Sequence, residues 1–315
     1  MRLVITTPAA AGSSHGNRNT AERWALHLRA GGHQVAVQVQ WDGTPADAMI
    51  ALHARRSHTS IIAWKAQYPA RPVALVLTGT DVYQDIHTDA AARQSLELAD
   101  RVVVLQEKAL DELVPRWRAK ARVIHQSVAP VTRGTPPDNS LLVTVIGHLR
   151  AVKDPFRAGY ALRHIDPDVP IEVSHLGQPM EPGMEEEARR LMAVEPRYRW
   201  LGEVDHRGAM DWLARSHAMV ISSRIEGGAH VVSEAIAAGV PVIASRVSGN
   251  VGLLGDDYAG YYPVGEERAL AASLARLHGD RSFVEQLERA VCARRFLIDP
   301  ALERHKLDAL TAEWA

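Results

Sequence analysis

Residues 221–245 read ISSRIEGGAHVVSEAIAAGVPVIAS, and this stretch decides the fold of the second half of the chain. A short apolar run ends near Ser222, a loop with Glu226 and two glycines follows, and an apolar helical pattern then runs as far as Gly239. Another β-branched run, Val242 to Ser245, comes next. A strand, a loop, a helix and a second strand in this order are typical of a parallel βαβ unit.

The loop before this helix has the composition of an anion-binding site. Glycines let the backbone approach a ligand closely, and the unpaired N–H groups at the start of the helix favour negative charge. Two carboxylates, one in the loop and one in the helix, provide charged acceptors that suit sugar hydroxyls. The predicted binding residues are Glu226, Gly227, Gly228, Ala229, His230 and Glu234.

Alternation of short β-branched runs with helical patterns extends over the whole chain. In the first half, strands are expected at Arg2–Thr6, around Val35–Val39, and at Met49–Leu52, Val73–Leu77, Val102–Leu105 and Ala121–His125. In the second half, they are expected at Leu141–Ile146, Ile171–His175, Arg199–Leu201, Met219–Ser222 and Val242–Ser245. A proline-rich linker, Val128–Ser140, separates the two series. The alternation predicts two doubly wound α/β domains whose ligands lie at the carboxyl ends of the strands, in a cleft between the domains.

The composition of the chain argues against several classes of protein. The 315 residues carry a net charge of −1, which argues against a nucleic-acid-coating or membrane-coating surface. A single cysteine, Cys292, excludes an intramolecular disulfide and a cysteine-rich zinc site. The first residues form no signal-peptide pattern, and no apolar run is long enough to span a bilayer. We therefore expect a cytoplasmic protein of undetermined oligomeric state.

The Glu226–Glu234 stretch closely resembles the donor-site signature of retaining glycosyltransferases of the GT-B fold, two Rossmann-like domains facing a central cleft. A second element, Gly147-His148-Leu149-Arg150-Ala151-Val152-Lys153, is similar to the family's Gly-Arg-Leu-x-x-x-Lys segment, which holds the nucleotide diphosphate. Lys153 falls on the family's lysine, whereas His148 replaces its arginine. We expect Arg150 to supply the missing charge, because alternate residues of an extended segment point to the same side. Trp200–Val204 resembles the family segment near the nucleotide base.

This resemblance implies a domain layout. Residues 1–130 form the acceptor domain and residues 131–285 form the UDP-sugar donor domain. Residues 286–315 form a helical segment that packs back on the first domain. The resemblance is most extensive over residues 140–265 and covers the first domain only in outline.

The predicted acceptor side lies after the strands of the first domain. A glycine- and hydroxyl-rich loop precedes the first helix, and two arginines follow the third strand, so that backbone donors and cations meet at one edge. The expected acceptor residues are Gly12, Ser13, Ser14, Gly16, Asn17, Arg55, Arg56 and Thr80, and the candidate bases are Asp81, His15 and His53. The family's histidine at the Thr78 position is missing.

Together these loops resemble a narrow branch of the family, the selenosugar synthases of selenoneine biosynthesis. The resemblance implies that selenophosphate attacks the anomeric carbon of a UDP-sugar, with N-acetylglucosamine the expected sugar, and that the Se–P bond is then hydrolysed. An anionic nucleophile needs charge compensation more than deprotonation. No metal-binding string is present, so we expect a reaction independent of metal and cofactor.

Other functions remain open. An ordinary O-glycosyltransferase or a UDP-sugar epimerase would share the donor site. A sugar-binding protein without activity would share the fold, because function resides in the site and not in the architecture.

Overall fold

The computed structural model of the chain describes residues 1–10, 12 and 16–314. It divides into two compact units, one made of Met1–Ser127 with Asp299–Ala315 and the other of Val128–Ile298. Each unit holds a six-stranded sheet in which all pairings are parallel. The predicted pair of doubly wound α/β domains is therefore confirmed.

The sheet of the first unit has the strand order β2-β1-β3-β4-β5-β6. Its central strands β3 and β4 are buried along their whole length, as expected for parallel strands covered by helices on both faces. The strands are β1 (Arg2–Thr6), β2 (Gln34–Gln38), β3 (Ala48–Leu52), β4 (Val73–Leu77), β5 (Arg101–Val104) and β6 (Ala121–Val123).

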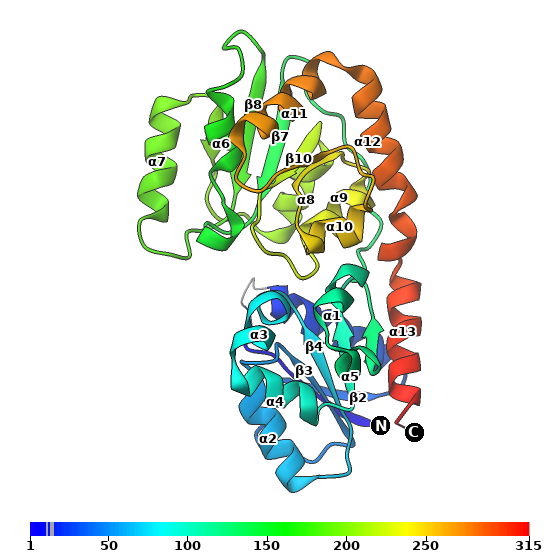
Figure 1. Cartoon of the computed structure of the whole chain (residues 1–315). Coiled ribbons are helices and arrows are strands. Elements are labelled where there is room, and N and C mark those ends of the chain that lie inside the picture. Colours follow the sequence, from blue (N-terminus) through cyan, green and yellow to red (C-terminus); the bar gives the residue numbers. More distant parts are fainter. Residues whose placement is uncertain (11, 13–15, 315) are drawn as a thin grey trace. The chain divides into compact units, whose positions relative to one another are not determined.

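Helices cover the two faces of this sheet with separate apolar clusters. On one face α1 (Gly16–Ala30) lies beside α13 (Pro300–Ala312) (Figure 1). Trp24 and Leu28 of α1 pack there with Leu307 of α13. On the other face, α2 (His58–Gln67) and α4 (Ala90–Leu98) pack together. The remaining short elements are η1 (Asp81–Asp85), α3 (Ile86–Thr88), η2 (Glu107–Glu112) and α5 (Pro115–Arg118).

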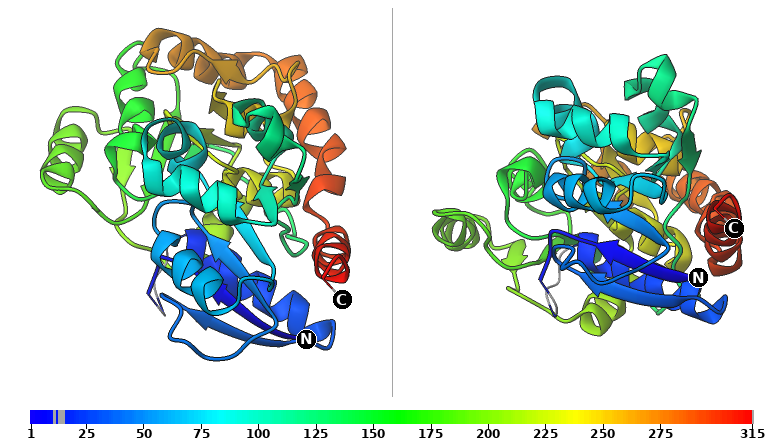
Figure 2. Two further views of the ribbon diagram at one scale, coloured as in Figure 1. Left: turned by 60° about the horizontal axis from the view of Figure 1, so that its bottom comes forward. Right: turned by 90° about the horizontal axis from the view of Figure 1, so that it is seen from below.

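A buried carboxylate on α13 fastens this helix within the first unit. Glu303 accepts hydrogen bonds from the Trp24 indole at 2.7 Å, from Nε of Arg23 at 3.0 Å and from the Ser127 amide at 3.1 Å. Burial alone would raise the pKa of Glu303, but hydrogen bonds from His27, Arg23 and Ser127 lower it to about 2. Both ends of the chain accordingly lie in this unit and close together (Figure 2).

The sheet of the second unit has the order β12-β11-β10-β7-β8-β9, so the chain winds outward from β7 in one direction and from β10 in the other. The adjacent strands β7 and β10 therefore form the topological switch point, where doubly wound sheets bind ligands. The strands are β7 (Leu141–Ile146), β8 (Ile171–Leu176), β9 (Tyr198–Trp200), β10 (Ala218–Ile221), β11 (Val242–Ser245) and β12 (Tyr261–Tyr262).

Helices of the second unit pack on this sheet and on one another, with α6 against α11 and α8 against α9. They are η3 (Ala151–Lys153), α6 (Arg157–Leu162), α7 (Met184–Val194), α8 (His206–Ala214), α9 (His230–Ala238), α10 (Ser248–Leu254), α11 (Glu267–Gly279), α12 (Arg281–Ala293) and η4 (Arg295–Ile298). Among the helices that the structure describes, none has the length and apolarity needed to cross a membrane.

Candidate active site

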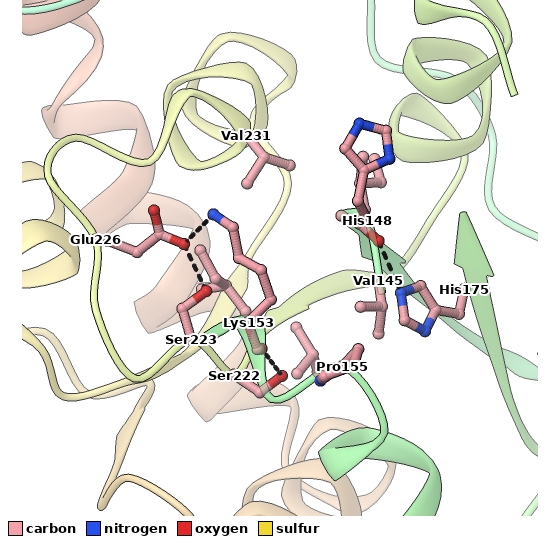
Figure 3. A pocket seen from close by; sticks show the side chains of 13 residues that line it. Val145, His148, Lys153, Pro155, His175, Ser222, Ser223, Glu226 and Val231 are labelled. Atoms are coloured by element: carbon pink, nitrogen blue, oxygen red, sulfur yellow. Dashed lines mark hydrogen bonds and ion pairs between the residues drawn. The ribbon is translucent and has the colours of Figure 1, made fainter. Parts of the chain in front are cut away.

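A pocket opens at the switch point of the second unit, between the carboxyl ends of β7 and β10 (Figure 3). Its walls come from the loops after these strands and from the start of α9, which contributes Val231. Three residues expected to bind the donor line it, namely His148, Lys153 and Glu226. Lys153 and Glu226 lie on one side of the pocket and His148 on the other (Figure 3).

Lys153 and Glu226 form an ion pair inside this pocket. Nζ of Lys153 lies 2.5 Å from Oε1 of Glu226, and the Ser223 hydroxyl donates to the same oxygen at 2.5 Å. The Glu226 side chain is only 8% exposed, whereas that of Lys153 is 33% exposed. The pair therefore presents a cation to the pocket while the carboxylate that orients it stays buried.

Asp154 sets the direction of the loop that carries Lys153. It adopts a left-handed conformation with φ of +46°, which aspartate tolerates better than most residues, and its carbonyl accepts a hydrogen bond from Ser222 at 2.8 Å. The Asp154 carboxylate in turn holds both Nε and a terminal nitrogen of Arg157, at 3.0 and 3.1 Å. The turn after η3 is thus tied to the end of β10.

Gly249 of α10 packs closely against the backbone of the loop that carries Glu226. A Cβ atom at this position would lie 2.0 Å from the carbonyl oxygen of Glu226, so only glycine allows α10 to pack against the loop. The sequence reasoning did not single out this residue, because the close approach joins positions more than twenty residues apart. A glycine next to the start of a helix was the only available signal.

His175 anchors the opposite wall. Its Nε2–H donates to the Gly147 carbonyl, at 3.0 Å, so its Nδ1 accepts from the Tyr198 hydroxyl, at 2.8 Å. Complete burial lowers the pKa of His175 to about 4, and the imidazole is neutral at pH 7. Gly177 also approaches this carbonyl, since a Cβ atom there would lie 2.0 Å from it. These contacts hold the backbone immediately before His148.

His148 lines the pocket, but Arg150 does not. Its backbone is extended, but its Nε lies 3.9 Å from Oε1 of Glu181, and it is not among the residues that line the pocket. Glu181 also accepts the Ala151 amide at 2.8 Å. The role of Arg150 in compensating the diphosphate charge stays a prediction.

The helix after the glycine pair begins and ends where the sequence indicated. α9 starts at His230, its N-cap Ala229 has no capping side chain, and Gly239 ends it in a left-handed conformation with φ of +68°. Gly227 and Gly228 precede this start, as predicted. An uncapped helix start beside a lysine favours an anionic ligand.

Glu234 of α9 faces two histidines, His230 of the same helix and His206 of α8. Its Oε1 is 2.9 Å from Nε2 of His206 and 3.6 Å from Nε2 of His230. It is not among the pocket-lining residues, so the structure pairs Glu226 with Lys153 and Glu234 with imidazoles. His206 was not expected from the sequence, because nothing in its spacing connects it with Glu234.

In the first unit, Asp81 joins two loops at the carboxyl edge of the sheet. Its Oδ1 accepts the amides of Thr78 and Gly79 at 2.9 and 2.7 Å, and its Oδ2 accepts the amide of Ala54 at 3.0 Å. The side chain is fully buried. Three backbone donors thus occupy the carboxylate that was a candidate base, and they connect the ends of β3 and β4.

His53 follows β3 in a left-handed conformation with φ of +76°, which is rare for a residue other than glycine. It is buried, with Nε2 at 3.4 Å from the Thr80 hydroxyl and 3.9 Å from Asp85. Burial lowers the pKa of His53, although the carboxylate of Asp81 acts in the opposite direction. Strained residues of this kind are frequent at functional sites.

Two exposed arginines follow His53 in its loop. Arg55 and Arg56 are exposed, and Nε of Arg55 donates to Asp85 at 3.1 Å. Gly16 begins α1 and Asn17 follows it, whereas Gly12 stands before this helix with φ of +75°. The predicted acceptor residues Ser13 and Ser14 and the candidate base His15 lie outside the described residues.

Comparison with known proteins places the chain in a family. The model of the family "Glycosyl transferases group 1" matches residues 132–292, about half of the chain and nearly the whole second unit. The chain therefore belongs to the group 1 glycosyl transferases, and its two doubly wound units have the folds of GT-B glycosyltransferases.

Solved structures of similar fold include HepE of Anabaena in complex with UDP and glucose. It is 15% identical, with a TM-score of 0.79 over 99% of this chain and 100% of that one. Sucrose-phosphate synthase of Thermosynechococcus elongatus is 16% identical, with a TM-score of 0.79 over 99% and 98%. A trehalose-6-phosphate protein of Escherichia coli, bound with UDP-2-fluoro glucose, is 13% identical, with a TM-score of 0.73 over 100% and 99%.

Proposed function

We propose that this glycosyltransferase transfers a sugar, N-acetylglucosamine, from a UDP-sugar to selenophosphate and then releases phosphate to give a 1-selenosugar. The observation that carries the acceptor assignment is the edge of the first unit, where Asp81 is occupied by three backbone amides while Arg55 and Arg56 are exposed. Such an edge suits an acceptor that arrives as an anion.

The donor half of the proposal rests on the pocket of the second unit. Lys153 and the start of α9 provide positive potential for a diphosphate, and a helix start adds roughly half a charge. Similar folds bind related ligands, since the Anabaena structure holds UDP and glucose. In the proposal, Lys153 and His148 contact the diphosphate and Glu234 accepts hydrogen bonds from sugar hydroxyls.

The first step forms a C–Se bond and breaks a C–O bond. Selenium attacks the anomeric carbon, and the electron pair of the C–O bond leaves on the β-phosphate of UDP. Cations placed where negative charge develops on the leaving diphosphate stabilise the transition state of this step. In the second step water attacks phosphorus, the Se–P bond breaks with its electron pair on selenium, and the products are the selenol and phosphate.

The role of a base is confined to this second step. His53 is the described candidate for receiving a proton from water: its Nε2 lies next to Thr80 and Asp85, while its Nδ1 accepts the Arg56 amide at 3.4 Å. His15 remains a second candidate. Asp81 is better suited to holding the His53 loop. Metal independence is part of the proposal, so saturating EDTA should leave the turnover number unchanged, and loss of activity that Mg²⁺ restores would refute this part.

The test is incubation with UDP-N-acetylglucosamine in the presence and absence of selenophosphate. The proposal predicts UDP release only with selenophosphate, together with a selenium-containing sugar in the mass spectrum. A variant with Glu226→Gln should lose both signals, since it removes the anion that orients Lys153.

An ordinary O-glycosyltransferase is the second candidate, because the His53 imidazole, 3.9 Å from Asp85, is also an arrangement that activates a hydroxyl. That function predicts UDP release with an alcohol acceptor and no need for selenophosphate. A UDP-sugar epimerase predicts a change of the sugar without any acceptor. The same incubations separate these outcomes.

A further inference from the structure

In the second unit, a solvent-exposed histidine forms a hydrogen bond with a buried carboxylate. Nε2 of His206 lies 2.9 Å from Oε1 of Glu234, and their side chains are 71% and 8% exposed, respectively. His206 is the first residue of α8, which packs against the helix α9 that carries Glu234. The imidazole thus occupies one oxygen of the carboxylate that, in the proposed function, accepts hydrogen bonds from sugar hydroxyls.

Few charges surround this contact. Besides Glu234, α9 contributes His230, whose Nε2 is 3.6 Å from the same carboxylate oxygen. Asp205, the N-cap of α8, is bound to the Gly208 amide at 2.7 Å, and β7, which also packs against α8, carries no charged residue. The hydrogen bond that His206 donates to Glu234 raises the pKa of His206; burial acts in the opposite direction, and the nearby Asp205 adds a smaller raising effect.

We propose that His206 competes with the sugar hydroxyls of the donor nucleotide for Glu234, so that donor binding releases a proton from His206. This inference rests on the proposed function, in which Glu234 is a hydroxyl acceptor. Both the imidazole N–H and a ligand hydroxyl donate to carboxylate lone pairs, and Oε1 already faces His206 at 2.9 Å and His230 at 3.6 Å, so a hydroxyl that binds this oxygen has to displace an imidazole. Gly202, with φ of +74°, lies in the loop before α8 and gives the backbone there conformational freedom.

The direction of the pH effect follows from this competition. In the free protein, Glu234 stabilises the protonated imidazole. When a ligand takes the carboxylate, His206 loses its partner and gives up its proton more readily. Binding and proton release are then linked, so affinity for the donor falls as the pH is lowered. For a solvent-exposed ion pair we expect a change of about two- to fivefold.

Calorimetric titration of the full chain with UDP-N-acetylglucosamine tests this linkage. The nucleotide sugar does not itself titrate near neutral pH. The titration is run at pH 7 in Pipes and in Tris, which differ in their enthalpy of ionisation, and repeated with His206→Ala, which removes the competing donor. The control is His87→Ala, which removes another exposed histidine paired with a glutamate, Glu112, at 3.0 Å in the first unit.

We expect the wild type and the His87 variant to release the same fraction of a proton, and the His206 variant to release clearly less. The His206 variant should also bind about two- to fivefold more tightly than the wild type at pH 6. Equal proton release by all three proteins would overturn the inference and leave the donor assignment intact. No binding by the wild type would overturn the donor assignment and the inference with it. If the protein formed no product with selenophosphate, the donor assignment and this inference would both stand.

Discussion

The ammonium group of Lys153 lies 2.5 Å from the carboxylate of Glu226, and both side chains line one pocket although they are 73 positions apart. The doubly wound order of the sheet produces this meeting, because the loops after β7 and β10 adjoin at the switch point. The pair keeps a cation at fixed orientation where the diphosphate of a donor is proposed to bind.

Replacing Lys153 by alanine should weaken use of the donor. A hydrogen bond to a charged group contributes roughly 1.5–3 kcal/mol, so kcat/KM for the UDP-sugar should fall by about 10- to 100-fold. Steady-state kinetics measures this change. The control is Lys65→Ala, which removes a lysine paired with Asp100 at 2.8 Å in the first unit. Equal kinetics for the wild type and the Lys153 variant would contradict the donor assignment.

Gly249→Ala should disturb the Glu226 loop without touching a ligand. The added methyl group would lie 2.0 Å from the Glu226 carbonyl, so the loop or α10 has to move. We expect a loss of stability of about 1–3 kcal/mol and a raised KM for the UDP-sugar. Urea unfolding and kinetics check both effects. Gly279→Ala, at the end of α11 where a Cβ atom meets open space, should leave both near wild type.

The second unit should become less stable in mild acid because of His175. Its pKa is about 4 in the folded protein and about 6.5 when unfolded, so the unfolded state binds the proton first. Stability is full above pH 6.5 and is lost as the pH falls toward 4, by roughly 3 kcal/mol in total.

Urea unfolding of the wild type and of His175→Gln at several pH values between 7 and 4 tests this effect. The glutamine offers one donor and one acceptor for Gly147 and Tyr198, but it does not titrate. The variant should lose less stability over this range than the wild type. Parallel losses in both proteins would show that another group is responsible.

Arg55→Ala is expected to weaken use of selenophosphate while leaving UDP affinity nearly unchanged. Arg55 is about half exposed and pairs with Asp85, so the change removes a cation from the proposed acceptor edge. We expect the KM for selenophosphate to rise by about 3- to 10-fold. Arg116→Ala, an exposed arginine paired with Glu97 at 2.8 Å, is the matched control. Equal loss of UDP binding would indicate a structural role for Arg55.

Much of the fold was predictable, because most strands are short apolar runs rich in β-branched residues and most long helices are amphipathic, although α2 is not. The exceptions are short. β12 contains only Tyr261 and Tyr262 and carries no periodicity. Glu107–Glu112 forms only a 3-10 helix, and α5 begins at Pro115, a residue that favours a helix start.

Site residues could be predicted from the sequence only where they belong to short local motifs. Lys153, His148 and Glu226 were assigned to one donor site, and the structure places all three around one pocket. The ion pair of Lys153 with Glu226, the contact of Gly249 with the Glu226 carbonyl, and the covering of Glu234 by His206 all join segments distant in sequence. Such contacts depend on the tertiary fold, which local patterns do not specify.

The most direct measurement is a ⁷⁷Se and ¹³C NMR spectrum of the product formed from selenophosphate and UDP-N-acetylglucosamine labelled with ¹³C at the anomeric carbon. The account predicts a one-bond coupling between selenium and this carbon, together with release of one UDP and one phosphate per sugar. An anomeric carbon bound to oxygen in every product, or no product at all in the presence of selenophosphate, would contradict it.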